Sequence, residues 1–157
     1  MNQITPTVTP LTDEQQKTVI AETERYIKKA TCLFNIKEQA IEITFDLKGR
    51  AAGMYRIKNQ KKFLFIHQQK AIRYNPYIFS KYFADNYATT IPHEVAHYVT
   101  DMLYGLKNIK PHGQEWKAVM LTFDADASVT ANYDLSGIPL KSQTFFSYQC
   151  NCRDHQL

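Results

Sequence analysis

The chain of 157 residues has no long apolar run and only three cysteines. A membrane-spanning helix needs about 20 consecutive apolar residues, and no stretch approaches that length. The polar start, Met1-Asn2-Gln3, lacks the features of a secretory signal. Cys150 and Cys152 flank a single residue, which suits a metal knuckle better than a disulfide framework. These absences predict a cytoplasmic protein in a reducing compartment, with no membrane among its partners.

Acidic residues are missing from one long segment. Residues 48–84 contain nine basic residues and no acidic one, whereas the rest of the chain has ten basic and fifteen acidic residues. The segment therefore carries +9 and the remainder −5, from the same counts, which predicts an electropositive face. The candidate nucleic-acid contacts within the segment are Lys58, Lys61, Lys62, Lys70 and Arg73.

Aromatic residues are interleaved with these cations. Exposed aromatic rings beside basic charge suit single-stranded DNA, because bases stack on the rings. Aromatics at alternating strand positions also suit a buried core, in which case the lysines form an ordinary solvated face. Both interpretations are open for the five aromatic residues concerned, which are Tyr55, Phe63, Phe65, Tyr74 and Tyr77.

The chain has no repeats, and its composition suits one globular domain with a core. Thr12 and Gln15 resemble the capping box of a helix, and Cys32 after that helix is expected to be a small core residue. Apolar periodicity predicts an α+β fold, in which an antiparallel sheet packs against helices. The expected elements are a helix over 13–30, strands over 41–47, 51–57 and 63–66, a turn over 58–61, a continued or fourth strand over 68–75, and a short helix over 77–88.

The clearest chemical motif is His93-Glu94-Val95-Ala96-His97. Helical spacing continues from Ile91 to Leu103, with Pro92 in the expected first turn and Gly105 as the expected stop. Residues four apart lie on one helix face, so both histidines can bind one metal ion, most often zinc. A carboxylate at Glu94 can accept a proton from water and pass it to a leaving amine. The alternative is a pair of half-buried histidines satisfied by hydrogen bonds.

A third histidine precedes a second amphipathic helix, in Pro111-His112-Gly113. We expect His112 to complete the metal site, with Gly113 allowing a tight turn beside it; His67 and His155 are the rival ligands. Asp101 follows His97 by one helical turn and is either an orienting partner or solvent-facing. Tyr133 and Tyr104 are candidate donors to an oxyanion, although most tyrosines serve packing.

Together these motifs resemble the SprT family of zinc metallopeptidases, which includes the protease core of Spartan, an enzyme that degrades proteins crosslinked to DNA. The resemblance implies a zincin-like domain over residues 1–143, with one Zn²⁺ held by His93, His97 and His112. It also implies a strand at 71–75 that pairs with substrate along its edge. The matching segments are His93–His97, Pro111–Trp116, Ala52-Gly53, Ile72–Pro76 and Thr144–His155.

In that family a Cys-x-Cys pair opens a zinc ribbon that a later Cys-x-x-Cys closes. Residues 144–157 contain only the first knuckle, Cys150 and Cys152, and we expect an incomplete ribbon-like tail.

The function that these motifs predict is a zinc-dependent endopeptidase, with Glu94 as general base and acid. The resemblance extends the expected substrates to proteins associated with DNA or crosslinked to it. One alternative is a nucleic-acid-binding module with a structural or vestigial zinc site, which would have no need of Glu94. A non-proteolytic metal hydrolase is the other.

Overall fold

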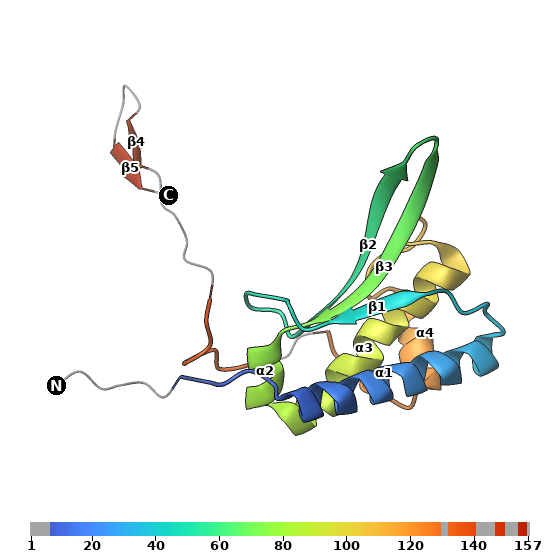
Figure 1. Ribbon diagram of the computed structural model, residues 1–157, viewed down its shortest axis with the longest axis horizontal. Helices are drawn as coiled ribbons and strands as arrows, with labels where there is room; N and C mark the ends of the chain where they lie inside the picture. The colour runs from blue at the N-terminus through green and yellow to red at the C-terminus, as the bar shows by residue number, and fades with distance from the viewer. Residues whose placement is uncertain (1–6, 130–131, 141–146, 150–153, 157) are drawn as a thin grey trace.

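The computed structural model describes residues 7–129, 132–140, 147–149 and 154–156. It is an α+β protein in which a small mixed sheet packs on helices (Figure 1). Among the described residues, no helix is both long and apolar enough to cross a membrane. The elements are α1 (Asp13–Phe34), β1 (Ile41–Thr44), β2 (Gly53–Lys62), β3 (Phe65–Tyr74), α2 (Pro76–Lys81), α3 (Phe83–Tyr104), α4 (Gln114–Thr122), β4 (Ser147–Gln149) and β5 (Asp154–Gln156).

The three-stranded sheet has the order β1-β3-β2. β2 pairs antiparallel with β3, from Gly53 opposite Tyr74 to Lys62 opposite Phe65. β1 pairs parallel with β3, so the prediction of an antiparallel sheet was wrong for this strand. The predicted substrate-pairing strand at 71–75 was also wrong. Its residues 71–73 belong to the central strand, whose backbone is already paired on both sides.

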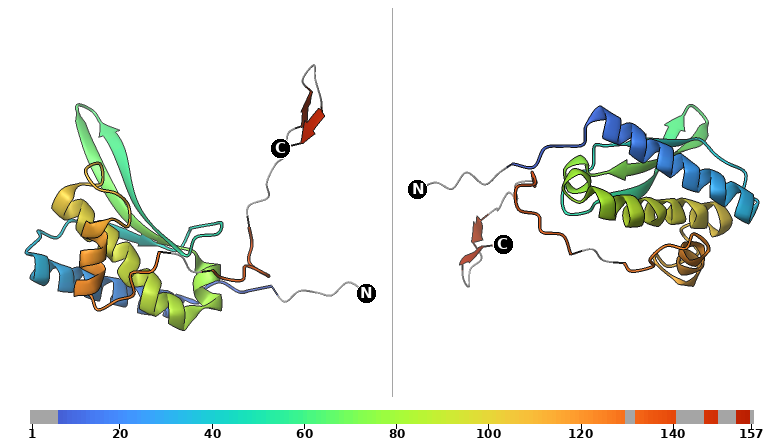
Figure 2. Two further views of the ribbon diagram at one scale, coloured as in Figure 1. Left: turned by 180° about the vertical axis from the view of Figure 1, so that it is seen from behind. Right: turned by 90° about the horizontal axis from the view of Figure 1, so that it is seen from below.

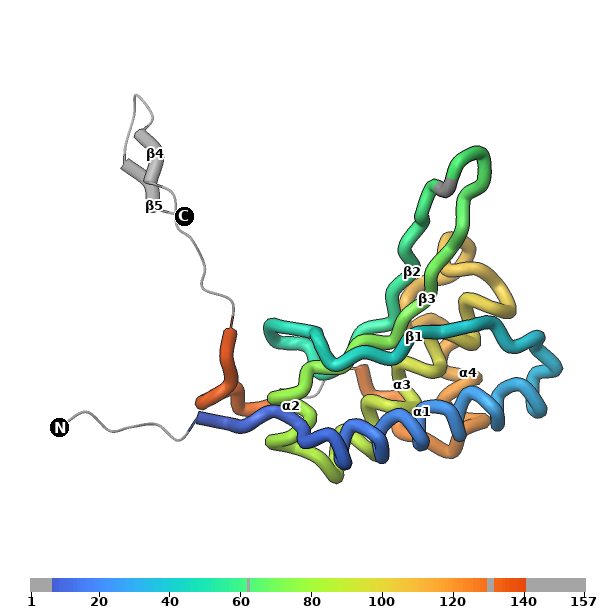
Figure 3. The backbone as a smooth tube through the Cα atoms, viewed as in Figure 1, coloured from blue at the N-terminus to red at the C-terminus, as the bar shows by residue number. Residues whose placement is uncertain are grey.

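β2 and β3 form one long hairpin whose two-residue turn is Phe63-Leu64. The predicted turn at 58–61 was wrong, because those polar residues continue β2. Of the predicted short strand at 63–66, the first two residues form the turn. Phe65 and Ile66 join the stretch after them in a single ten-residue strand, β3. Figure 3 shows the hairpin extending past the helices.

α1 begins as predicted, at a capping box in which Thr12 Oγ1 accepts from Gln15 N–H at 3.2 Å and Gln15 Oε1 accepts from Thr12 N–H at 2.9 Å. The helix continues to Phe34, four residues beyond the predicted end. This extension places Cys32 in an exposed position, so the prediction that Cys32 belongs to the core was wrong.

α3 begins at Phe83, well before the expected first turn, and Pro92 lies inside it. An internal proline removes one helical hydrogen bond and crowds the preceding turn. Here the flanking residues Ile91 and Val95 are fully buried, and their packing offsets that cost. The proline was therefore a misleading marker of the helix start.

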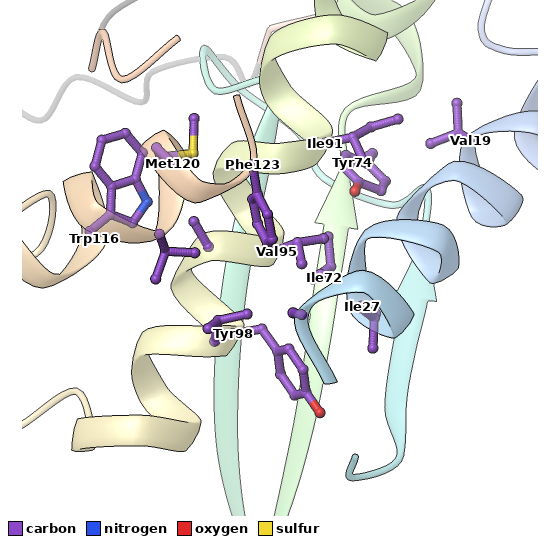
Figure 4. Packing of buried hydrophobic residues seen from close by; sticks show 14 of the residues in the cluster. Val19, Ile27, Ile72, Tyr74, Ile91, Val95, Tyr98, Trp116, Met120 and Phe123 are labelled. Atoms are coloured by element: carbon purple, nitrogen blue, oxygen red, sulfur yellow. The ribbon is translucent and has the colours of Figure 1, made fainter. Parts of the chain in front are cut away.

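The core lies between the sheet and the helices (Figure 4). α1 and α3 pack side by side on one face of the sheet, as Figure 2 shows from below. α4 packs against α3 and closes the core beneath the predicted metal residues. The main buried side chains are Val19 and Ile27 of α1, Ile72 and Tyr74 of β3, Ile91, Val95 and Tyr98 of α3, and Trp116, Met120 and Phe123 of α4 with its C-cap.

Candidate metal centre

Three imidazoles converge on one point. The Nε2 atoms are 3.2 Å apart between His93 and His97, 3.1 Å between His97 and His112, and 3.0 Å between His93 and His112. Nitrogen ligands about 2.0–2.1 Å from a tetrahedral zinc ion lie about 3.3–3.4 Å apart. The three side chains together could hold a metal ion, and their chemistry and spacing fit zinc. Of the rival ligands, His67 is exposed on the hairpin, whereas nothing is described of the side chain of His155.

The chain turns sharply where it delivers His112. This residue has φ 57, in the left-handed region that few non-glycine residues occupy. Gly113 has an ordinary φ of −73. A Cβ on Gly113 would lie 2.9 Å from the carbonyl oxygen of Lys110 and 3.1 Å from Glu115 Oε2. Gly113 therefore permits close backbone approach, while the unusual backbone angle falls on the ligand itself.

Trp116 supports all three imidazoles from α4. The residue is fully buried, and its ring lies 4.7 Å from that of His93, 5.8 Å from that of His97 and 4.8 Å from that of His112. Its indole N–H donates to the backbone carbonyl of His93 at 3.3 Å. Helical periodicity marks this residue only as core; its position four residues after His112 is the signal for a role beside the metal site.

Burial tunes the imidazoles toward the neutral form. It lowers the pKa of His93 to about 4 and that of His97 to about 3, with neighbouring imidazoles adding to the effect. Burial also lowers the pKa of His112. A neutral imidazole has a free lone pair, which is what a metal ion requires.

Glu94 lies beside the histidines and is only 5% exposed. Burial raises the pKa of its carboxyl to about 8, against a smaller opposing effect of the Tyr55 N–H. That N–H, on β2, donates to Glu94 Oε2 at 2.7 Å. The contact is possible because Gly53 has no side chain. A Cβ there would lie 2.7 Å from Glu94 Cγ, 2.8 Å from its Oε1 and 2.8 Å from Thr90 Cγ2.

A cleft of about 530 Å³ opens beside His93 and Glu94. Tyr133 lines it and donates to the Asp85 carboxylate. Burial, with Asp85 adding to it, raises the pKa of this phenol to about 12. Tyr104 is exposed and is not among the lining residues. The lining residues are Arg50, Ala51, Ala52 and Gly53 before and in β2, Asp85, Thr89, Thr90, His93 and Glu94 of α3, and Asp126, Ser128, Val129, Asn132 and Tyr133 after α4.

Asp101 has neither of the two expected roles, because it neither faces solvent nor orients His97. It accepts from the hydroxyl of Tyr55 at 2.8 Å and from the ammonium of Lys70. No bond to His97 accompanies these contacts. Lys70 is only 7% exposed, because strand alternation turns it to the inner face with Ile72, so its ammonium pairs with Asp101 and is not presented at the surface for the predicted nucleic-acid contact. Burial, together with Asp101, raises the pKa of the Tyr55 phenol.

The other predicted nucleic-acid contacts occupy different positions. Arg73 pairs with Asp46 through two nitrogens, at 2.9 and 3.1 Å, so its charge is neutralised locally. Lys58 and Lys61 are exposed on β2. Lys62 is the last residue of β2, and only its backbone is described.

The five aromatic residues of the basic segment do not form one exposed surface. Tyr74 is fully buried and Tyr55 is hydrogen-bonded to Asp101, whereas Phe63 and Phe65 are exposed at the hairpin tip.

The predicted knuckle, Cys150 and Cys152, lies outside the described residues. The flanking strands β4 and β5 pair antiparallel.

Comparisons with known proteins identify the family of this chain. The SprT-like family model matches residues 20–135, and the chain belongs to that family. It is 35% identical over 116 residues to Protein SprT of Vibrio parahaemolyticus, covering 73% of this chain and 61% of that protein. It is 33% identical over 131 residues to Protein SprT of Actinobacillus succinogenes, covering 83% and 72%. The chain thus spans under two thirds of the Vibrio relative's length. No solved structure matches significantly.

Proposed function

We propose that this chain is a zinc-dependent endopeptidase of the zincin type. The observation that carries the proposal is the convergence of three Nε2 atoms within 3.2 Å of one another. Two of them belong to α3, the helix that also supplies Glu94, and His112 is brought to them from the turn before α4. His93, His97 and His112 would hold the ion. A bound zinc ion supplies a Lewis acid that polarises the scissile carbonyl and lowers the pKa of water.

Glu94 provides the proton transfers. Its carboxylate accepts a proton from the attacking water, and it then donates that proton to the nitrogen of the departing amine. The Tyr55 N–H fixes Oε2, which leaves Oε1 for the exchange. A carboxyl pKa raised to about 8 by burial suits a group that must both accept and release a proton near neutral pH.

Substrate would bind in the cleft beside β2. Within the described chain, β2 pairs with β3 alone, so it is an edge strand, and residues 50–53 line the cleft. An extended peptide can add to such an edge through backbone hydrogen bonds. β2 therefore replaces residues 71–75 as the proposed substrate-binding strand.

The direct test is cleavage of an unfolded protein by the zinc-loaded chain, compared with Glu94→Gln. The variant keeps the three histidines, so we expect normal zinc content and loss of cleavage. Cleavage at the wild-type rate would rule out this mechanism. Inactive wild-type protein with bound zinc would instead favour a structural zinc site.

We further propose that the substrates include proteins held on DNA. The support is the charge distribution, in which residues 48–84 carry nine basic and no acidic residues. Nucleic-acid phosphates would attract this segment, whereas the acidic remainder would be repelled. A DNA-binding substrate protein should be cleaved faster when it is bound to DNA than when it is free. Equal cleavage rates for the bound and the free protein would contradict this part of the proposal.

A further inference from the structure

The β2–β3 hairpin has an outer half that no third strand supports. β1 pairs with β3 only from Lys70 onward, whereas β2 and β3 stay paired as far as Lys62 and Phe65. At about 3.4 Å per residue, the turn at Phe63 lies about 27 Å along the hairpin from Tyr55. Figures 1 and 3 show this ribbon projecting beyond the helices.

The tip of the ribbon carries apolar side chains at its turn and on both of its faces. Phe63, Leu64, Phe65 and Ile66 are between 71% and 90% exposed. Strand alternation sends Phe65 and Ile66 to opposite faces, and Phe63 and Leu64 form the turn. Contiguous exposed apolar surface of this kind marks an interaction site. Because the apolar side chains occupy the turn and both faces, this surface suits insertion into a partner better than stacking on one face.

Turn geometry does not account for Phe63. This residue has φ 55, at a turn position where glycine or asparagine is usual. A phenylalanine at this position strains the backbone. Packing of its side chain does not offset that strain, since the side chain is 90% exposed. Its presence is therefore best explained by contact with a partner.

Positive charge flanks the tip. Lys58 and Lys61 are exposed, and they lie on opposite faces of the ribbon because they are an odd number of residues apart in one strand. No acidic residue occurs between Asp46 and Asp85. A partner that fits this arrangement offers two lines of negative charge with an apolar layer between them.

We propose that the β2–β3 hairpin is an arm that enters a groove of duplex DNA, where Phe63 and Leu64 wedge between base pairs. The two phosphate backbones that border a groove would meet Lys58 and Lys61 on the two faces of the ribbon. Two-stranded ribbons enter DNA grooves, and Phe, Leu and Ile side chains act as wedges that unstack base steps. The inference rests on the proposal that DNA is a partner, and it requires no peptidase activity.

The wedge is tested with the full chain and a short duplex that contains 2-aminopurine at its centre. Unstacking by the wild type should raise the 2-aminopurine fluorescence. In Phe63→Gly/Leu64→Ser, glycine suits the positive φ, so the turn should be retained while the wedge is removed. We expect this variant to lose the fluorescence rise and about tenfold in affinity, the scale of one lost base contact. Leu121→Ser, which removes an exposed apolar side chain from α4, should behave as wild type.

The phosphate contacts are tested by salt dependence. The logarithm of the binding constant falls linearly with the logarithm of the salt concentration. Lys58→Glu/Lys61→Glu should make this slope less steep by about 2, because each lysine that contacts a phosphate releases about one counterion. Lys17→Glu/Lys28→Glu makes the same change in net charge at exposed positions of α1. This control should leave the slope nearly unchanged if the contacts are confined to the hairpin.

The outcomes separate the two proposals. No duplex binding at low salt would overturn both the DNA partner and the arm. Duplex binding in which the tip variant still raises the fluorescence would overturn the wedge alone. Tip-dependent binding that favours single strands, or vesicles of anionic phospholipid, over the duplex would also overturn it and assign the tip to that other partner.

Discussion

Replacing Gly53 with alanine should damage the site without altering a metal ligand. The new Cβ would lie 2.7 Å from Glu94 Cγ, 2.8 Å from Glu94 Oε1 and 2.8 Å from Thr90 Cγ2. Gly53 has no positive φ, so the effect is steric rather than conformational. Either β2 moves away from α3 or Glu94 rotates, and both changes break the 2.7 Å bond from Tyr55 N–H.

The magnitude follows from these contacts. Overpacking of this kind costs about 1–3 kcal/mol of folding free energy. A misplacement of about 1 Å in a catalytic group can cost about 100-fold in rate. We therefore expect a small fall in Tm, a fall of about 10- to 100-fold in kcat/KM, and an unchanged zinc content.

The matched comparison is Gly49→Ala, because a Cβ on Gly49 meets nothing within 4 Å while its φ of +106 disfavours alanine. That variant should lose about 1–3 kcal/mol of stability through backbone strain and keep its kcat/KM. Wild-type Tm and kcat/KM in Gly53→Ala would refute the proposed contact between β2 and Glu94.

Three further outcomes are expected. His112→Ala should weaken zinc affinity by more than about 100-fold in a chelator competition, since loss of an orienting partner alone costs about 10–100-fold. Lys70→Met should destabilise the fold by about 3–5 kcal/mol in urea, because it leaves Asp101 charged and buried, whereas Lys70→Met/Asp101→Leu should recover most of that loss. In zinc-free protein, Tm should rise with pH up to about 6.5, because the α3 histidines have lowered pKa values of about 4 and 3 and destabilise the fold as they are protonated. Between about pH 6.5 and 8, Tm should fall, because the Glu94 carboxyl is ionised in the unfolded chain but keeps its proton in the fold up to its raised pKa of about 8, and Glu94→Gln should remove that fall.

The sequence by itself determined the local features of this protein. The spacing of His93 and His97 places both on one face of any α-helix, and the capping box at Thr12 satisfies backbone groups within one turn. His112 was predicted from its place before an amphipathic helix. The first two inferences depend on residues a few positions apart, where the geometry of the helix leaves little choice, whereas the approach of His112 to His93 and His97 is a tertiary contact.

Tertiary structure alone decided which strand is central and which side chains meet. A β-strand carries its pairing groups along both edges, so sequence pattern does not identify its neighbours. Because β1 pairs with β3, residues 71–73 have no free edge for substrate. The edge strand beside Glu94 is β2 instead. Strand alternation turned Lys70 inward to Asp101, whereas the length of the hairpin exposed Phe63 and its neighbours. These outcomes depend on contacts between residues far apart in the chain, which local pattern does not encode.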